Sequence, residues 1–368
     1  MRIIVGFLLA VGLQLSVGTA QAAKFKLETL ATGLDHPWSI AFLPDGRWLI
    51  AEKSGALRVY ADGALQSESV AGVPPVYFAS QGGLFDVLPA PDFEHSKLLY
   101  LSFAHGNRSK NATRVVRAEL SGRQLQKLTP VFTASPLKDT PVHYGGRMAW
   151  MRDGSLLLTL GDGYNYREEA QGLDNHFGKM VRINPDGSVP QDNPYVDQPG
   201  ALPEIYSYGH RNPQGLIVDG ERGLIYMHEH GPRGGDELNL LAPGKNYGWP
   251  AITYGIDYSG AVISPFTEMK GMEQPLTYWV PSIAPSGMAQ YRGELFADWT
   301  GDLLITALAE RSLRRVKLDS AGKVLGQEQL ELGINERLRA VSVAPDGAVI
   351  LLTDGAGGKL LRVTPGGK

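Results

Sequence analysis

A histidine and a nearby carboxylate are the minimum for general-base chemistry, and this chain offers one candidate pair. His143 stands in the segment HYGGR, and Asp162 stands in LGDG. A carboxylate beside an imidazole fixes its tautomer and stabilises the imidazolium, so that the ring can take a proton from a substrate. Taken singly, His143 is also an ordinary loop residue and Asp162 an ordinary turn-former before Gly163. The pair is functional only if the fold brings the two segments together.

Three arginines add a candidate anion site. Arg211 lies in YGHRNPQG, and Arg337 and Arg339 lie two positions apart in ERLR, where a strand would point both to one side. Guanidinium groups bind carboxylates through paired hydrogen bonds and stack on flat rings. We therefore expect a multiply charged anion with planar acceptor groups, and solvent-exposed arginines are the competing interpretation. Further polar side chains stand beside strand-like runs: Gln81, Asn212 and Gln214.

Two neighbouring segments carry candidate metal ligands. In His228-Glu229-His230 both imidazoles would share one face of a strand, which suits a transition metal, but no third ligand follows at a defined spacing. The glycine-rich run GPRGGDELNLL brings backbone carbonyls next to Asp236 and Glu237. Oxygen ligands of this kind are those that calcium prefers. We expect calcium here, with a metal-free glycine-rich loop as the alternative.

The elements that must position these residues come from a repeated unit. Turns of the Pro-Asp-Gly kind between two strand-like runs recur along the chain, and the middle run of each unit is almost continuously apolar, as in WLIAE, SLLLTL and LLITAL. Such runs are typical of strands buried on both faces. Six units are recognised: 36–60, 82–120, 145–187, 212–241, 286–319 and 339–363.

Six such units predict an all-β fold, a six-bladed β-propeller with four-stranded antiparallel blades, formed as one domain by residues 23–368. Each unit has roughly 58 residues, somewhat more than common propeller blades, and the insertions account for the difference. Sustained helical periodicity is missing, which disfavours an α/β barrel. Because a propeller presents loops at the mouth of its channel, we expect a site assembled from several blades.

The first residues predict export. Arg2 precedes an apolar run over residues 3–17, and Ala20-Gln21-Ala22 is the small-x-small pattern that a signal peptidase cleaves. We therefore predict a signal peptide over residues 1–22 and, in a Gram-negative cell, a periplasmic location; an uncleaved anchor is the alternative. No later segment has the roughly 20 apolar residues of a membrane-spanning helix, so the mature chain is expected to lack a membrane span.

Composition excludes several classes of function. The formal net charge of −3 provides no basic excess for a nucleic acid backbone. The chain has no cysteine, which excludes disulfides, thiolate metal sites and cysteine nucleophiles. Its 45 glycines and 24 prolines are a turn-rich composition, as many short strands require.

Several motifs in a fixed order identify a family. HYGGR, LGDG, YSYGHRNPQG, EHGPRGGDELNLL, NYGWP and ERLRAV follow one another along the chain. In this order they resemble the soluble quinoprotein glucose dehydrogenase family, and within it the aldose sugar dehydrogenase branch. The resemblance spans nearly the whole mature chain. It implies a six-bladed propeller that binds pyrroloquinoline quinone and calcium and oxidises an aldose at its anomeric carbon to the lactone.

The resemblance also implies roles for individual residues. His143 would be the general base, Asp162 the carboxylate that orients it, and Arg211 the group that polarises the quinone oxygen. Calcium would bind the carbonyls of Gly231 and Pro232 beside the quinone. Further cofactor contacts are implied for Gln81, Asn212, Gln214, Arg337 and Arg339. A structural calcium ion would use Glu237 with carbonyls around Tyr247, and Asp257.

Some positions depart from the pattern of the glucose-specific members. Val142 replaces an aspartate before the base, and Val280, beside Trp279, replaces an aromatic residue. Ala309 aligns with a cofactor-binding lysine, and His230 replaces a glutamine. Because matched polar contacts are what reject analogues strongly, we expect aldoses of several kinds to be oxidised with similar efficiency. The physiological sugar and the periplasmic electron acceptor stay open.

Two rival functions use the same fold. A propeller lactonase, which is a metal-dependent hydrolase, would need several acidic or amide ligands converging on the channel, where this sequence has arginines. A non-catalytic binding propeller would need neither His143 nor Asp162.

Overall fold

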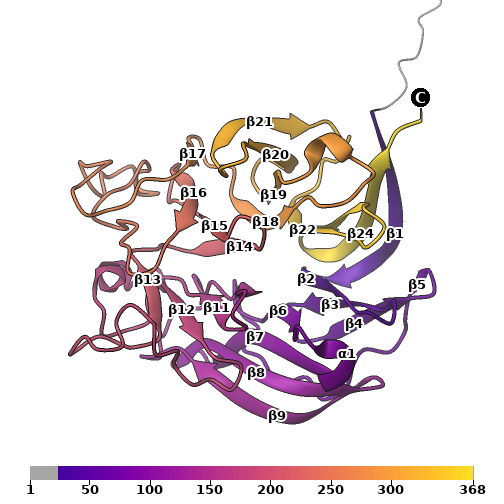
Figure 1. Cartoon of the computed structure of the whole chain (residues 1–368), viewed down its shortest axis with the longest axis horizontal. Coiled ribbons are helices and arrows are strands. Elements are labelled where there is room, and N and C mark those ends of the chain that lie inside the picture. The colour runs from indigo at the N-terminus through magenta and orange to yellow at the C-terminus, as the bar shows by residue number, and fades with distance from the viewer. Residues whose placement is uncertain (1–23, 368) are drawn as a thin grey trace, which may run out of the picture.

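Six antiparallel sheets of four strands each are arranged around a central axis, as the blades of a propeller (Figure 1). The structure is a computed structural model and describes residues 24–367. The predicted fold class, a six-bladed all-β propeller with four-stranded blades, is confirmed. The predicted signal peptide lies outside the described residues and stays a prediction.

Five of the blades are formed by consecutive strands. Their strands are β2 to β5 (Pro37–Phe42, Trp48–Glu52, Leu57–Ala61, Ala64–Leu65), β6 to β9 (Leu84–Pro89, Leu98–Gly106, Asn111–Ser121, Gln124–Thr133), β10 to β13 (Met148–Trp150, Leu156–Thr159, Lys179–Ile183, Ile205–Tyr208), β14 to β17 (Pro213–Asp219, Leu224–Glu229, Asp236–Leu241, Thr277–Trp279) and β18 to β21 (Pro285–Gln290, Leu303–Ala307, Ser312–Leu318, Val324–Leu330). Helices are short: α1 (Phe93–Ser96) and two 3₁₀ turns (Arg167–Gln171, Ala297–Trp299).

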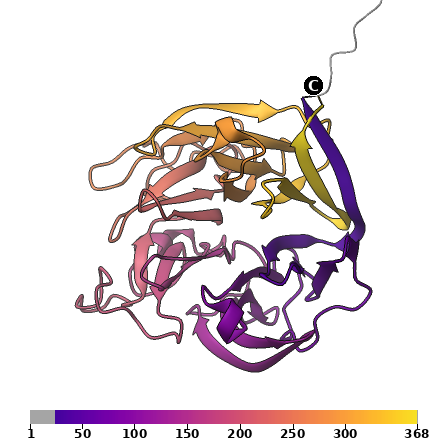
Figure 2. The same cartoon turned by 45° about the vertical axis from the view of Figure 1, so that its right-hand side comes forward.

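The sixth blade joins the two ends of the described chain. It contains β22 (Leu338–Val343), β23 (Val349–Thr353), β24 (Ala356–Pro365) and the first strand, β1 (Phe25–Asp35). β1 pairs antiparallel with β24, with Phe25 opposite Pro365. Figure 2 shows the two strands side by side at the edge of the ring. The repeat pattern alone did not predict that β1 completes this blade.

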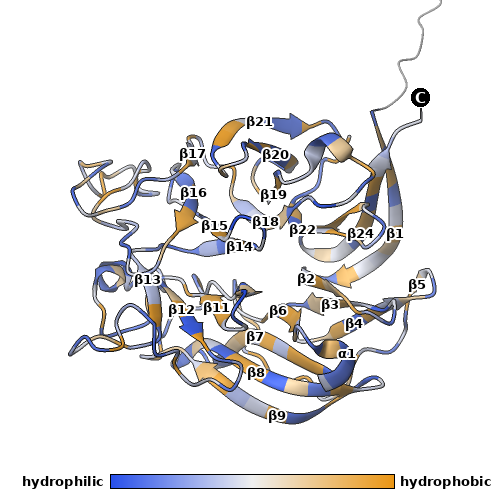
Figure 3. Ribbon diagram, viewed as in Figure 1, coloured by the Kyte–Doolittle hydropathy of each residue, from blue (hydrophilic) through white to orange (hydrophobic). Residues whose placement is uncertain are grey.

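Local sequence explains the hairpins and the buried strands. In the first blade the turn between β2 and β3 closes at Gly46, whose φ of +88° is readily adopted by glycine and whose N–H bonds to the carbonyl of Leu43. The second strand of each blade is covered on both faces; β19 and β23, for example, are buried at every position. Hydrophobic residues accordingly follow the strands of the blades (Figure 3).

The hydrophobic core lies mainly between blades. One cluster packs Leu49 and Leu57 of the first blade against Leu84 and Leu99 of the second. Such interfaces fix each blade relative to the next, and they also hold the connecting loops in place. No helix in the described part of the chain is long and apolar enough to cross a membrane.

The innermost strands bring polar residues together. β2, β6, β10, β14, β18 and β22 contact one another in turn around the channel. Residues that directly precede these strands therefore converge at one end of it: Gln81 before β6, His143 before β10, Asn212 before β14 and Arg337 before β22.

A long insertion within the fourth blade adds to the same end. Residues 242–276 connect β16 to β17 and form part of the loops at the left edge of Figure 1. This insertion supplies Trp249, Asp257 and Tyr258 to a cavity that also contains His143.

Candidate functional site

His143 and Asp162 form a buried pair. Nδ1 of His143 lies 2.6 Å from Oδ1 of Asp162, and their side chains are 6% and 1% exposed. The backbone N–H of Tyr164 donates to the same oxygen, and Nε1 of Trp249 donates to Oδ2 at 2.7 Å. Because a carboxylate only accepts, Nδ1 carries the proton and Nε2 is left as the acceptor. Both carboxylate oxygens are fixed, so the ring is held in one orientation.

The backbone at the histidine adopts an unusual conformation. His143 has φ +51°, in the left-handed region that non-glycine residues rarely adopt. Its N–H donates to Oε1 of Gln81 at 2.8 Å. Close by, a Cβ at Gly145 would lie 2.4 Å from the carbonyl of Thr159, so only glycine allows this approach. Backbone conformations of this kind concentrate at functional sites.

Electrostatics keep the pair in the form that a base needs. Burial lowers the pKa of His143, the hydrogen bond and charge of Asp162 raise it, and the cations Arg211 and Lys138 lower it; the net direction is down. Burial raises the pKa of Asp162, but His143 and Arg211 lower it further, so that the net shift is downward. At neutral pH His143 is therefore neutral and Asp162 is ionised.

A cavity of about 420 Å³ opens above this pair. Its walls combine charged and aromatic side chains, among them Tyr164, Arg167, Glu168, Asp257 and Tyr258. Tyr164 and Tyr258 are 48% and 59% exposed. Aromatic faces and hydrogen-bonding groups in one cavity suit a polyhydroxylated ligand.

Arg211 lies in the wall of the same cavity and is held by backbone groups. Its guanidinium donates to the carbonyls of His230 and Gly231 at 3.1 and 2.6 Å. Its N–H donates to the carboxylate of Glu229, and its guanidinium lies 5.3 Å from the ring of Trp249. No carboxylate of residues 24–367 forms an ion pair with this guanidinium, so its charge is available to a ligand.

A second cavity, of about 190 Å³, carries several cations. Arg337 and Arg339 both line it, and both bind Asp354, at 3.0 and 3.1 Å. The aromatic residues Trp38 and Phe85 contribute apolar surface. The remaining polar lining residues are Lys53, Gln81, Asn212, Gln214 and His230. Since Gln81 in this cavity bonds to the backbone of His143 in the first, the two cavities are neighbours.

The residues expected to bind the structural calcium ion line two different cavities. Glu237 and Tyr247 line a small cavity together with Glu229 and Gly231. Asp257 lies instead in the wall of the larger cavity, with Oδ2 3.7 Å from Nη1 of Arg167. The structure therefore does not bring Asp257 to Glu237.

One buried oxygen atom close to Glu237 lacks a hydrogen-bond partner. Burial and the neighbouring carboxylate of Glu229 raise the pKa of Glu237. Nδ2 of Asn239 donates to Glu237, while Oδ1 of Asn239 is buried without any hydrogen bond. Two carboxylates and an unsatisfied amide oxygen are a donor set for a hard cation. Pro232, the other residue of the implied calcium pair beside the quinone, lines the larger cavity.

The two histidines of the HEH segment do not form a metal pair. Nε2 of His228 and Nε2 of His230 each lie near a backbone carbonyl, those of Gly287 and Pro285. Within residues 24–367 no group of three or more histidine and carboxylate side chains is placed to hold a metal.

Comparison with known proteins settles the family. The model of the glucose/sorbosone dehydrogenase family matches residues 34–362. The chain belongs to this family. The resemblance seen in the sequence motifs is thereby confirmed, and an oxidoreductase activity of the sugar dehydrogenase type is supported.

Relatives from this family match almost the whole chain. Aldose sugar dehydrogenase YliI of Escherichia coli is 41% identical over 353 residues, which are 94% of each chain. A solved glucose dehydrogenase is 47% identical, with a TM-score of 0.89 over 92% of this chain and 99% of its own. The PQQ-bound aldose sugar dehydrogenase of Streptomyces coelicolor is 28% identical, with a TM-score of 0.75 over 93% and 98%.

Sequence reasoning missed several residues of this family member's site. Trp249 and Glu229 stand in quoted motifs, NYGWP and EHGPRGG, but their contacts with Asp162 and Arg211 cross between distant segments. Asp354 in LLTDG was not identified as the partner of the two arginines. Lys53 lies in the first unit, in a segment without any other functional signal.

Proposed function

We propose that this chain is a pyrroloquinoline quinone-dependent aldose sugar dehydrogenase that oxidises the anomeric carbon to the lactone. The observation that carries the proposal is the neutral, carboxylate-oriented His143 in a polar and aromatic cavity, directly beside a cationic one. The quinone-bound relative from Streptomyces coelicolor supports the choice of cofactor.

The donor set of the second cavity fits this cofactor. Pyrroloquinoline quinone is flat and carries three carboxylates, and Arg337, Arg339 and Lys53 face the cavity with Asp354 as the carboxylate that the two arginines share. Guanidinium groups bind carboxylates in pairs of hydrogen bonds. Gln81, Asn212 and Gln214 would add amide contacts.

Oxygen ligands are available for calcium in two places. The carbonyl of Gly231 accepts a hydrogen bond from Arg211, and its second lone pair is free for a cation, as is the carbonyl of Pro232. Near Glu237 the unpartnered oxygen of Asn239 and the backbone around Tyr247 fit a second ion. Asp257 does not join this set, because it lines the larger cavity.

The residues of this chain would have different roles in the reaction. Nε2 of His143 removes the proton of the anomeric hydroxyl, and Asp162 stabilises the imidazolium that forms. Arg211 presents positive charge where negative charge develops. When bound, the quinone would supply a two-electron acceptor for the hydride from C1, so that the sugar would lose two electrons and two hydrogens and become the lactone. The predicted signal peptide would place this reaction in the periplasm, and the acceptor that reoxidises the cofactor is left open.

A reconstitution assay tests the proposal. Purified apoprotein is mixed with the quinone, with and without Ca²⁺, and dye reduction is followed with several mono- and disaccharides. We expect activity only with quinone and Ca²⁺ together, and kcat/KM values within about tenfold among aldoses, or about 1.4 kcal/mol. No activity with any aldose would overturn the proposal, and a preference above a hundredfold for glucose would overturn the expected broad range.

The rival functions are less well supported. A metal-dependent lactonase needs several acidic or amide ligands that converge on the channel, where this chain has Arg211, Arg337 and Arg339. A binding propeller has no use for a histidine whose carboxylate partner is fixed by two further hydrogen bonds.

A further inference from the structure

Lys53 occupies a fixed place at the cationic cavity. It follows β3 in the first blade and lines the cavity together with Arg337 and Arg339 of the sixth. Its backbone N–H donates to the carbonyl of His36, and its carbonyl accepts from the N–H of Leu84, both at 3.1 Å. These bonds connect the position to two blades, so the start of the side chain is well defined.

The ammonium group has unused hydrogen-bonding capacity. A lysine ammonium has three donors, and Nζ of Lys53 donates to the carbonyl of Ser80 at 2.7 Å. The same atom lies 5.9 Å from the centre of the Phe78 ring. In the described part of the chain Lys53 forms no ion pair. Two donors are therefore available to a ligand in the cavity.

Charge around the cavity is unbalanced. Asp354 is shared by Arg337 and Arg339 and so cannot neutralise both, and Lys53 adds a third cation. Burial lowers the pKa of Lys53, and so does the charge of Arg339, while the charges of Asp354 and Asp35 raise it by less. Like charges that face one cavity repel each other, and a bound polyanion would relieve this repulsion.

Position 309 gives a reason for a lysine elsewhere. The family resemblance places a cofactor-binding lysine at 309, where this chain has alanine. Leu308, next to it, lines the cationic cavity, so the alanine at 309 brings no positive charge to that side. Lys53 brings an ammonium group to the same cavity from a different blade.

We propose that Lys53 is a further cofactor-binding residue, whose ammonium binds a carboxylate of pyrroloquinoline quinone and takes over from the lysine that is absent at 309. The inference rests on the proposed function. It adds an ammonium contact from the first blade to a cofactor whose other proposed side-chain contacts come from the second, fourth and sixth blades.

Equilibrium binding of the quinone to apoprotein tests this assignment without any turnover. Titration with Ca²⁺ present is followed by calorimetry for wild type, Lys53→Met, Lys53→Gln and Lys53→Arg. Lys127→Met is the control, because Lys127 is 75% exposed and pairs with Glu119 on an outer strand. We expect ten- to hundredfold weaker binding for the Met and Gln variants, near wild-type binding for Arg, and no change for the control.

The trimethyl ester of the quinone separates direct contact from an effect on the Ser80 turn. If Lys53 binds a carboxylate, wild type and Lys53→Met bind the ester with affinities within about twofold. An equal loss for acid and ester, or acid binding by Lys53→Met and Lys53→Gln as tight as wild type, would overturn the role of Lys53 while the proposed function stands. Wild type that fails to bind the quinone would overturn both.

Discussion

Both oxygen atoms of the Asp162 carboxylate accept hydrogen bonds, and these bonds fix the carboxylate that orients His143. One oxygen accepts from the imidazole and from the backbone of Tyr164, and the other accepts from the indole of Trp249. A histidine that is buried, neutral and oriented in this way is suited to remove a proton rather than to carry permanent charge.

Replacing the base tests its role directly. His143→Asn is expected to lower kcat by 10²- to 10⁴-fold, the usual contribution of a general base. Calorimetric binding of the quinone should stay near wild type, because the imidazole acts on the sugar. Unchanged kcat in the fully loaded variant would contradict the assignment.

A buried lysine, Lys138, lies close to the same histidine and lowers its pKa. Burial lowers the pKa of Lys138 to about 7, and Nζ donates to the carbonyl of Val142, one residue before the base, at 2.8 Å. In acid this lysine is charged and lowers the pKa of His143. The base must be neutral to act, so kcat/KM falls as the pH drops through that pKa.

The pH profile checks this coupling. The acid limb of kcat/KM in wild type should have its midpoint below pH 6.5, the ordinary value for histidine. In Lys138→Met the midpoint should move to higher pH, because a repelling charge is gone. Lys127→Met is the control and should keep the wild-type profile; a midpoint of Lys138→Met at or below that of wild type would be evidence against the coupling.

Residues whose side chains can take part directly in a reaction could be predicted from the sequence. His143 and Asp162 were paired because their types fit one reaction, and the structure brings them to 2.6 Å. Trp249 was not predicted, because its contact with Asp162 spans 87 positions and depends on the path of a long insertion. Asp257 was assigned with Glu237 only from the family resemblance, and it lies on the same long insertion as Trp249, in the wall of the larger cavity.

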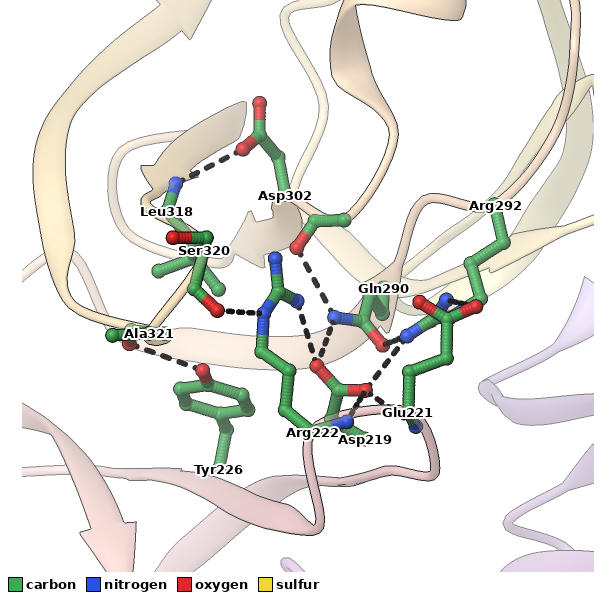
Figure 4. Close-up of polar contacts among 12 residues, drawn as sticks. Asp219, Glu221, Arg222, Tyr226, Gln290, Arg292, Asp302, Leu318, Ser320 and Ala321 are labelled. Carbon is green, nitrogen blue, oxygen red and sulfur yellow. Dashed lines mark hydrogen bonds and ion pairs between the residues drawn. The ribbon is translucent and has the colours of Figure 1, made fainter.

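At the scale of elements, the turn between β14 and β15 joins two blades. Asp219 is fully buried at its start and accepts from Arg222 in the turn, from Gln290 at the end of β18 and from Arg292 just after that strand (Figure 4). Arg222 also reaches the carbonyl of Ser320 between β20 and β21. One carboxylate thereby connects the fourth blade to the fifth.

Asp219→Asn should destabilise the fold by about 2 kcal/mol at pH 7, because two arginines lose their partner and both are partly solvated. Burial raises the pKa of Asp219, but the hydrogen bonds from Gln290, Arg222 and the backbone of the turn together bring it well below its ordinary value. Its stabilisation is therefore present above the ordinary carboxyl pKa and is lost as the pH falls through the lowered one.

Urea unfolding at pH 7 and pH 3 measures how much Asp219 contributes to the free energy of unfolding. The difference between wild type and Asp219→Asn should shrink at the lower pH. Asp186→Asn is the matched control, since Asp186 bonds within its own turn to Ser188, and it should change little. A difference that is absent at pH 7, or that grows in acid, would contradict the role of the turn.

At the scale of the whole molecule, closure of the ring depends on β1. Leu34 of β1 is fully buried in a cluster with Ile50 of the first blade and Ile350, Leu352 and Leu360 of the sixth. The strand therefore contributes to the interface at which the first and last units meet, as well as to the sheet of the sixth blade.

Leu34→Ala is expected to lower the free energy of unfolding by about 2 to 5 kcal/mol, the usual cost of such a truncation in a core. Leu27→Ala in the same strand is the control, because Leu27 is 37% exposed, and it should change stability by less than about 0.5 kcal/mol. Equal stability of the two variants in urea would mean that β1 does not hold the ring closed.

The blades themselves were predictable because all, or in the sixth blade three, of their four strands are consecutive in the sequence. Turn residues and apolar runs recur within each unit, and the six units correspond to the six sheets. Closure was not predictable from the repeats, because β1 pairs with a strand at the other end of the chain and most of its side chains are at least partly exposed. A strand with little apolar signal gives no sign of its partner.

In the proposed reaction His143 is the base for oxidation of an aldose at its anomeric carbon. The most direct test is the lactone formed in a single anaerobic turnover, without dye, by protein loaded with quinone and Ca²⁺. Wild type should form about one equivalent of aldonolactone per bound cofactor, and loaded His143→Asn should form far less in the same time. No lactone from wild type, oxidation at another carbon, or equal yields from the two proteins would contradict this role of His143.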